Sequence, residues 1–244
     1  MTQRKISRGG IIFLIACIAL LCTLGTWQVK RLHWKNEVLQ TLEKEYARDP
    51  LKNKFGAAHF KRIATQSPAI AYGVIRGHFR HNFEMLIGPR THDGAPGYNV
   101  ITPFAMAGDG GHVLVNRGWI PLDKADPDTR TESQTGGIVT LTGLARLPDK
   151  PNFFTPANDP ARHIWYSINP PEMAAAANVP NFPDTIFYAE TQDPWLTNTY
   201  PVMAATRTMP PNNHLQYAIF WFTMALIFAA LPLLYALWPA KKES

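Results

Sequence analysis

The sequence predicts a membrane-anchored α+β protein, in which two transmembrane helices bracket a mainly antiparallel β domain that carries one or two helices of its own. Two long apolar segments without a charged residue lie near the ends of the 244-residue chain. Between them, short runs rich in β-branched and aromatic residues alternate with Gly, Pro, Asn and Asp clusters, which is typical of short strands joined by turns. The mean hydropathy is slightly negative, so a polytopic transporter is excluded.

Residues 1–8 are predicted to be a cytoplasmic N-terminus and residues 9–29 the first transmembrane helix. This apolar segment holds no charge and is long enough to cross a hydrocarbon core of about 30 Å. A cleaved signal peptide or a lipoprotein site ending at Cys17 is the alternative, but the apolar run continues beyond Cys17, which favours a retained helix. Leucines at helical spacing then predict a helical stalk over residues 30–48, before Asp49-Pro50.

Residues 49–213 are predicted to form the β-rich extramembrane domain, an antiparallel sheet of six or seven strands that curls into a partial barrel. The Asp-Gly in THDGAPG predicts a turn, NPPEMAAAANV predicts a helix, and the polar DKADPDTRTESQTGG predicts a mobile loop. The predicted strands are AYGVIRGHFR, FEMLIGPR, YNVITPFAMA, HVLVNRGWIP, IVTLTGLARL, HIWYSIN and TIFYAET.

Residues 214–238 are predicted to be the second transmembrane helix, followed by a tail over residues 239–244. Lys241 and Lys242 lie just beyond this helix, whereas the TMPPNN segment before it carries no charge. Basic residues mark the cytoplasmic side of a span. Because two spans return the chain to the same side, both termini are expected in the cytoplasm and the β domain in the periplasm or an equivalent compartment.

Composition excludes several function classes. Both cysteines, Cys17 and Cys22, lie in the first span, so the β domain cannot perform thiol–disulfide exchange. The net charge of +6 comes from scattered basic residues, without the run that favours nucleic acid. No hydrolase or phosphate-binding motif is present. A metal site at His78 and His81, or a tethered hydrolase that uses His78 or Asp93, is less well supported than exposed strand histidines and a turn aspartate.

The motif VNRGWIP, residues 115–121, combines an apolar strand with a polar, basic and aromatic end. One interpretation is structural, with Gly118 permitting a bend and Trp119 filling the core. The other is functional, with Asn116, Arg117 and Trp119 binding a partner or an anionic group through charge-assisted hydrogen bonds. The residues alone leave both interpretations open.

The start of the second span, PPNNHLQYAIFWF, brings an ionisable ring to the edge of the membrane. One helical face of this span, within an arc of about 80°, holds His214, Tyr217, Trp221, Ala225 and Phe228. An ionisable residue at such an edge usually has a partner or a function, and neutral imidazole is a good axial ligand for haem iron. The alternative is a hydrogen-bonding histidine at a helix end that Asn212 or Asn213 caps.

In an antiparallel pair of spans, the outer end of the first helix would form the opposite wall of a haem site. There Trp27 offers another ring, and Gly25 permits close approach of the helices. Lys30 and Arg31 would lie level with haem propionates. No second axial ligand is obvious in the sequence, although His33 lies nearby on the predicted stalk.

Several motifs together resemble the Surfeit locus protein 1 family, over nearly the whole chain and in the same order. They are LGTWQVKRLHWK, VIRGHF, PR followed by GYNVITPF, VNRGWIP and NNHLQYAIFWF. The resemblance implies a non-enzymatic assembly factor for haem–copper cytochrome c oxidase that binds haem a transiently. Its implied partners are the lipid bilayer, the large oxidase subunit and haem a synthase. His214 matches the family's suggested haem ligand, and Tyr217, Gly77 and Asn116 to Trp119 match other recurrent positions.

Two expectations about function follow. The first is a chaperone that holds haem a between the outer ends of the helices, with His214 on iron and Tyr217, Trp221 and Trp27 against the ring. The second is a membrane-tethered scaffold that stabilises an oxidase assembly intermediate without binding cofactor. The start MTQRKISRGG lacks the composition of a mitochondrial presequence, so the bacterial cytoplasmic membrane is the expected location.

Overall fold

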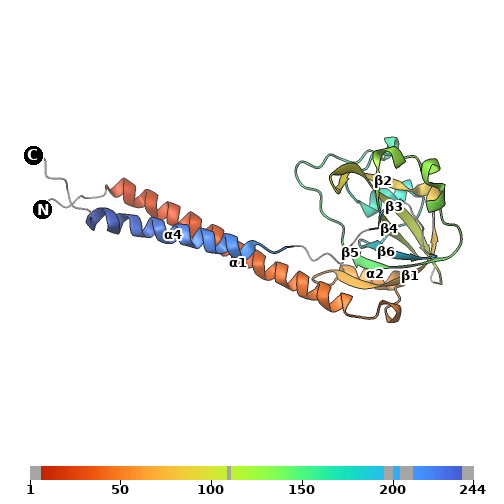
Figure 1. The fold of residues 1–244 in the computed structure, drawn as a ribbon, viewed down its shortest axis with the longest axis horizontal. Coiled ribbons are helices and arrows are strands. Elements are labelled where there is room, and N and C mark those ends of the chain that lie inside the picture. The colour runs from red at the N-terminus through yellow and green to blue at the C-terminus, as the bar shows by residue number, and fades with distance from the viewer. Residues whose placement is uncertain (1–6, 109–110, 195–199, 204–210, 238–244) are drawn as a thin grey trace, which may run out of the picture. The chain divides into compact units, whose positions relative to one another are not determined.

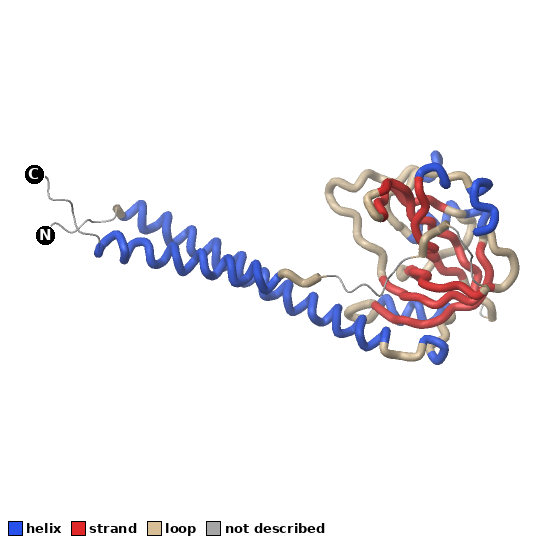
Figure 2. The backbone as a smooth tube through the Cα atoms, in the orientation of Figure 1, coloured by secondary structure: helices blue, strands red, loops and turns tan. Residues whose placement is uncertain are grey.

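The computed structural model describes residues 7–108, 111–194, 200–203 and 211–237. The chain divides into two compact units, one formed by Met1–Gln40 with Pro210–Ser244 and the other by Thr41–Met209. Helices make up the first unit, and the strands all belong to the second (Figure 2). Two long terminal helices and a mainly antiparallel β domain between them confirm the predicted fold class.

The helical unit contains helix α4, His214–Leu237, which lies beside the first part of helix α1, Arg8–Tyr46 (Figure 1). Helix α4 is apolar and contains no Lys, Arg, Asp or Glu. Both helices are long and apolar enough to cross a membrane. Small residues let them approach closely, since a Cβ atom on Gly25 would lie 2.8 Å from the Phe222 ring. Ala218 and Ala225 of α4 are buried in the described structure. No break separates the predicted span from the predicted stalk, because α1 is one helix.

The β unit contains one six-stranded sheet in the order β1-β5-β6-β4-β3-β2. All neighbours are antiparallel except β4 and β6, which pair in parallel. The strands are β1, Ile70–Phe79; β2, Met85–His92; β3, Ala95–Met106; β4, His112–Pro121; β5, Val139–Arg146; and β6, Ile186–Asp193.

The sheet closes into a barrel because β1 pairs with two strands. Gly77 lies at the crossing, opposite Val139 of β5 and Met106 of β3. A Cβ atom there would lie 2.0 Å from the Ala105 carbonyl oxygen, so only glycine allows the backbones this approach. Without β2, the barrel has the Greek-key connectivity of OB-type folds. Connectivity alone does not indicate a ligand.

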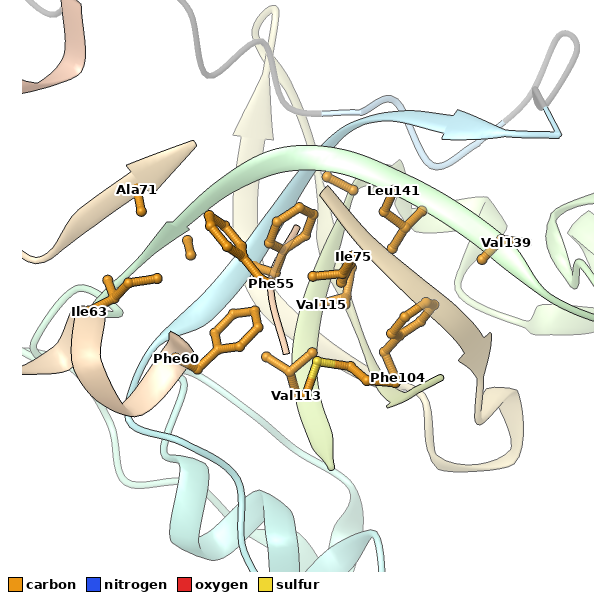
Figure 3. Packing of buried hydrophobic residues seen from close by; sticks show 14 of the residues in the cluster. Phe55, Phe60, Ile63, Ala71, Ile75, Phe104, Val113, Val115, Val139 and Leu141 are labelled. Atoms are coloured by element: carbon orange, nitrogen blue, oxygen red, sulfur yellow. The ribbon is translucent and has the colours of Figure 1, made fainter. Parts of the chain in front are cut away.

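Apolar side chains from most of the strands fill the barrel. Strand residues point alternately to the two faces of a sheet, and here one face gathers inside with residues from helix α2, Ala57–Ala64 (Figure 3). Phe55 and Phe60 meet edge to face with ring centroids 5.8 Å apart, a favourable aromatic geometry. The other labelled core residues are Ile63, Ala71, Ile75, Phe104, Val113, Val115, Val139 and Leu141.

Local signals correctly placed one turn and one helix. The loop from β2 to β3 is Asp93-Gly94, with positive φ angles of 48° and 81°, as a two-residue hairpin turn requires. Helix α3, Pro170–Ala176, begins after Asn169, whose side chain accepts a hydrogen bond from the Glu172 N–H.

The seventh predicted strand, HIWYSIN over residues 163–169, is wrong. In the described structure this segment makes only isolated bridges, one of them between Trp165 and Ile87. The Asn158 side-chain oxygen accepts hydrogen bonds from the Tyr166 and Ser167 N–H groups. A side chain thus takes the donors that a neighbouring strand would need.

The mobile loop predicted over residues 123–137 is also wrong, because most of it folds into two 3₁₀ helices, Leu122–Lys124 and Pro127–Ser133. Arg130 in its centre is fully buried. Its guanidinium donates to both Glu84 carboxylate oxygens and to the Lys124 carbonyl oxygen. One buried ion pair therefore fixes a segment whose composition is that of a flexible loop.

Candidate functional site

His214 is the first residue of α4, and two asparagines tie this end of the helix to α1. The Asn212 side-chain oxygen lies 3.4 Å from the His214 backbone N–H and accepts its hydrogen bond. The Asn212 side-chain nitrogen donates to the Asn36 side-chain oxygen of α1 over 2.8 Å. The capping role expected for Asn212 is thus present, and the same residue joins the two helices.

The His214 ring points toward α1. Its Nδ1 atom lies 2.8 Å from the Oε1 atom of Gln28, which is buried. An amide oxygen only accepts hydrogen bonds, so Nδ1 carries the proton in this pair and Nε2 keeps its lone pair. A protein that uses histidine as a metal ligand commonly fixes the tautomer in this way, by a hydrogen bond at the other ring nitrogen.

The predicted flat side chains lie on the outside of the helical unit. Trp27 and Tyr217 are 55% and 53% exposed, and Trp221 is partly buried with its ring centroid 5.2 Å from that of Phe220. Trp27 precedes Gln28 and is therefore about 100° around α1 from it. The helix surface at Trp27 forms a hollow of about 440 Å³, lined by Cys22, Thr23, Thr26, Trp27 and Lys30.

The expectation that haem a lies between the outer ends of the two helices stays a prediction. The two helices pack closely next to this end, because a Cβ atom on Gly25 would lie 2.8 Å from the Phe222 ring and Ala218 is buried. We therefore expect a flat ligand of His214 to lie against the exposed surface of the helix pair.

The basic residues predicted near the propionates are on α1. Lys30 and His33 are exposed, and Lys30 lines the hollow beside Trp27. The Arg31 guanidinium carbon lies 3.9 Å from the centroid of the Trp34 ring, a cation–π contact. The described residues bring no carboxylate into a salt bridge with Lys30 or Arg31.

The functional interpretation assigned Asn116, Arg117 and Trp119 to a partner or an anionic group, and the structure shows all three residues buried. Gly118 has a φ of +125°, and the register between β3 and β4 shifts at this point, as expected for a bulge. The Trp119 indole N–H donates to the Arg90 carbonyl oxygen. The structural interpretation accounts for Gly118 and Trp119, whereas Asn116 lines a pocket of the β unit.

Arg117 is 1% exposed, and its charge is compensated inside the protein. Its Nη2 donates to the Ser133 carbonyl oxygen over 2.5 Å, and its Nη1 lies 3.6 Å from Glu84 Oε2. Burial lowers the pKa of Arg117 to about 10, and the Glu84 carboxylate opposes that shift. Sequence reasoning missed Glu84 and Arg130 because nothing local marks two distant residues as a buried pair.

The residues named for hydrolase or metal chemistry are not brought together. His78 is exposed on β1, and Asp93 is a turn residue. The His81 Nε2 lies 3.0 Å from the Thr135 carbonyl oxygen and donates to it. In the part of the chain that the structure describes, no three residues of the metal-binding types cluster.

Comparison with known proteins places these features in a family. Residues 15–226 match the model of the SURF1 family. Surfeit locus protein 1 of Rattus norvegicus is 32% identical over 225 residues, which cover 86% of this chain and 70% of that protein. The human protein of the same name is 30% identical over 218 residues, with 83% and 69% covered. A SURF1-like protein of Monosiga brevicollis is 32% identical over 237 residues, with 92% and 87% covered.

Proposed function

This chain belongs to the SURF1 family, and from that premise we propose that it assists the assembly of a haem–copper cytochrome c oxidase by holding haem a for the large oxidase subunit. The protein catalyses no reaction in this proposal. It binds a cofactor, shields it and releases it. The resemblance of the His214 segment to the family's suggested haem site supports the assignment, and haem a synthase is the proposed donor.

The single observation that carries the proposal is the contact between His214 and Gln28. The 2.8 Å approach of Gln28 Oε1 to Nδ1 leaves Nε2 as the basic nitrogen, which is the form that ligates haem iron. Trp27, Tyr217 and Trp221 supply flat apolar surface, and Lys30 supplies a cation for a propionate. When bound, haem a contributes an iron that accepts an imidazole nitrogen as axial ligand.

The absorption spectrum of the purified protein tests this proposal. We expect full-length protein from cells that make haem a to carry a haem spectrum, and His214→Ala to lose it. Asn213→Ala is the matched control, because this exposed side chain precedes the histidine. His33→Ala tests the second axial position. An unchanged haem spectrum in His214→Ala would exclude His214 as the ligand.

A purely structural role for His214 is the second candidate, since the same hydrogen bond also holds two helices together. In that case the protein is a scaffold for an oxidase intermediate. His214→Gln separates the two candidates, because glutamine can keep a hydrogen bond to Gln28 but is a poor haem ligand. Normal haem content of the oxidase in cells that carry His214→Gln would favour the scaffold.

We further propose that both termini lie in the cytoplasm of a bacterium and the β unit in the periplasm. The charge difference across the second apolar segment supports this orientation, with Lys241 and Lys242 on one side only. A reporter that is active only in the periplasm should be active when inserted in the exposed turn at Gly94 and inactive at the C-terminus. The reverse pattern would contradict the orientation.

A further inference from the structure

A pocket of about 480 Å³ lies within the β unit, where residues of five strands and of two loops line it. Its lining combines apolar residues with several hydrogen-bond donors. Arg90 of β2, Asn116 of β4 and Arg146 of β5 contribute side chains, and Tyr188 of β6 contributes its ring. All of them belong to one compact unit, so the pocket does not depend on the membrane helices or on the proposed haem site.

Asn116 is a buried polar group that faces this pocket. Its side-chain oxygen accepts the Gly118 N–H over 3.0 Å. The amide nitrogen is therefore the end that remains, and it donates to no residue within the described ranges. An amide donor that lines a pocket can bind an acceptor atom of a ligand.

Positive charge exceeds negative charge around the pocket, where Arg90, Arg146 and Lys150 are accompanied only by Asp149. Arg90 donates to two carbonyl oxygens, those of Pro89 and Tyr166, and no carboxylate forms a salt bridge with it within the described residues. These carbonyl contacts hold the guanidinium in place, and the nearby Asp149 carboxylate, whose pKa Arg146 and Arg90 lower, is the one acidic group among the described residues that lines the pocket. An anionic group is the complement of such a cation.

Arg146 is held in a comparable way. Its guanidinium carbon lies 4.3 Å from the Tyr188 ring centroid, and its Nη1 donates to Asp149 Oδ1 over 2.9 Å. A second contact, from Nη2 to Asp149 Oδ2 over 3.4 Å, makes this ion pair bidentate. The Asp149 side chain is 85% exposed, so it can turn into water and leave the Arg146 guanidinium to a ligand carboxylate.

Two phenylalanines stand beside the pocket with almost no cover. Phe153 is 95% and Phe154 is 87% exposed, and Phe154 lines the pocket. Their ring centroids are 5.4 Å apart. An exposed apolar surface that polar residues surround is typical of a binding site. A ligand that covers them must carry an apolar group next to its anionic group.

We propose that this pocket binds an extended peptide segment of a partner protein, in which a carboxylate side chain is followed by an aliphatic or aromatic one. The carboxylate contacts Arg90, Arg146 and the Asn116 amide, and the apolar side chain covers Phe153 and Phe154. A peptide fits better than a small dicarboxylate, because a small acid can occupy the pocket but leaves both rings in water.

Fluorescence anisotropy with full-length protein in detergent tests the proposal. The probe is a short labelled peptide with a glutamate followed by leucine, and its partner probe carries glutamine in place of the glutamate. We expect the glutamate peptide to bind at least about tenfold more tightly than the glutamine peptide, as a buried charge-assisted contact predicts. Equal affinities would overturn the proposal.

Four variants show whether binding occurs at this pocket. Arg146→Gln and Phe154→Ala should each weaken binding about tenfold. Asp149→Asn should strengthen it, because the competing carboxylate is removed. Lys52→Gln is the control, since it deletes a positive charge from the exposed surface of the same unit and should leave affinity unchanged.

The remaining outcomes are also decisive. If Lys52→Gln weakens peptide binding as much as Arg146→Gln does, the effect is one of net charge. That result would overturn the proposed site. If succinate displaces the labelled peptide as well as unlabelled peptide does, the pocket binds a free small acid, and the peptide assignment is wrong. Binding of anionic vesicles that requires Phe154, without any peptide binding, would make the two rings a membrane contact and overturn the peptide assignment.

Discussion

Gln28 and His214 join the two helices through one hydrogen bond, with Gln28 Oε1 2.8 Å from His214 Nδ1. The bond fixes which nitrogen of the ring keeps its lone pair. We expect Gln28→Leu to lower haem affinity by about tenfold, because loss of an outer hydrogen bond to a ligating histidine typically costs 10–100-fold in affinity. The axial-ligand signature in the spectrum should persist, since His214 is still present.

Titration of full-length protein with haem measures this effect. Gln40→Leu on the exposed surface of α1 is the control, and its affinity should equal that of the wild type. If Gln28→Leu binds haem as tightly as the wild type, the hydrogen bond does not orient the ligand. If it abolishes the haem spectrum entirely, Gln28 has a larger role than orientation.

Glu84 is the only carboxylate in the described structure that forms salt bridges with the buried Arg117 and Arg130. We expect Glu84→Gln to lower the free energy of unfolding by about 3–5 kcal/mol, because it leaves two buried cations without their counter-charge. Denaturant unfolding followed by tryptophan fluorescence measures the change. Glu132→Gln, at an exposed position of the adjacent loop, should change stability by less than about 0.5 kcal/mol. A similarly small effect at Glu84 would contradict the account of the buried cluster.

The elements that the sequence predicted correctly are those with local signals. Charge-free apolar segments revealed both long helices, and Asp93-Gly94 revealed a hairpin turn. The errors concern contacts between distant residues. Arg130 lies in a polar loop and is buried only because Glu84, 46 positions earlier, accepts its guanidinium. Residues 163–169 have the composition of a strand, but the Asn158 side chain takes their backbone donors.

The candidate site shows the same division. His214 was identified because it is an ionisable residue at the edge of an apolar segment. Gln28 was not identified as its partner, although a polar residue at the end of the first span was a usable signal. The position of Trp27 on the outside of the pair could not be predicted, because it depends on which face of α1 packs against α4. The closing role of Gly77 depends likewise on a pairing between distant strands.

Gly25 and Phe222 provide a test of the helix pair. A Cβ atom on Gly25 would lie 2.8 Å from the Phe222 ring, so we expect Gly25→Leu to separate the helices. Adding Phe222→Ala should restore the pair in part, because it removes the ring that clashes. The two changes share one contact, so their effects should not be additive.

Chemical cross-linking measures this separation, with Asn36→Cys and Asn212→Cys as the attachment points and Cys17 and Cys22 replaced by serine. The side chains of Asn36 and Asn212 are hydrogen-bonded to each other, so a short cross-linker should join cysteines at these positions efficiently. Gly25→Leu should reduce the yield, and the double variant should recover part of it. Gly9→Leu is the control, because a Cβ atom on Gly9 would have no atom within 4 Å. This change should leave the cross-linking yield unchanged. Full cross-linking in Gly25→Leu would mean that small residues are not required for the pairing.

Protonation of His81 should lower the free energy of unfolding in mild acid. Burial lowers the pKa of His81 below its usual 6.5, and the charge of Arg117 lowers it further, while the Thr135 carbonyl acts in the opposite direction. The unfolded chain therefore binds a proton at higher pH than the folded protein does. The stabilising contribution is complete above about pH 6.5 and is lost as the pH falls through the depressed folded pKa.

The glutamine variant isolates this contribution. In His81→Gln the side chain can still donate to Thr135 and accept from Arg117, whose Nη1 lies 3.5 Å from His81 Nδ1, but it does not titrate. We expect the free energy of unfolding to fall more steeply between about pH 7 and pH 5 in the wild type than in His81→Gln. Other groups, such as His112, whose pKa burial also lowers, titrate equally in both proteins and cancel in the difference. If both proteins show the same pH dependence, the pKa of His81 is the same in the folded and unfolded states. That result would contradict the effect of burial beside Arg117 on this pKa.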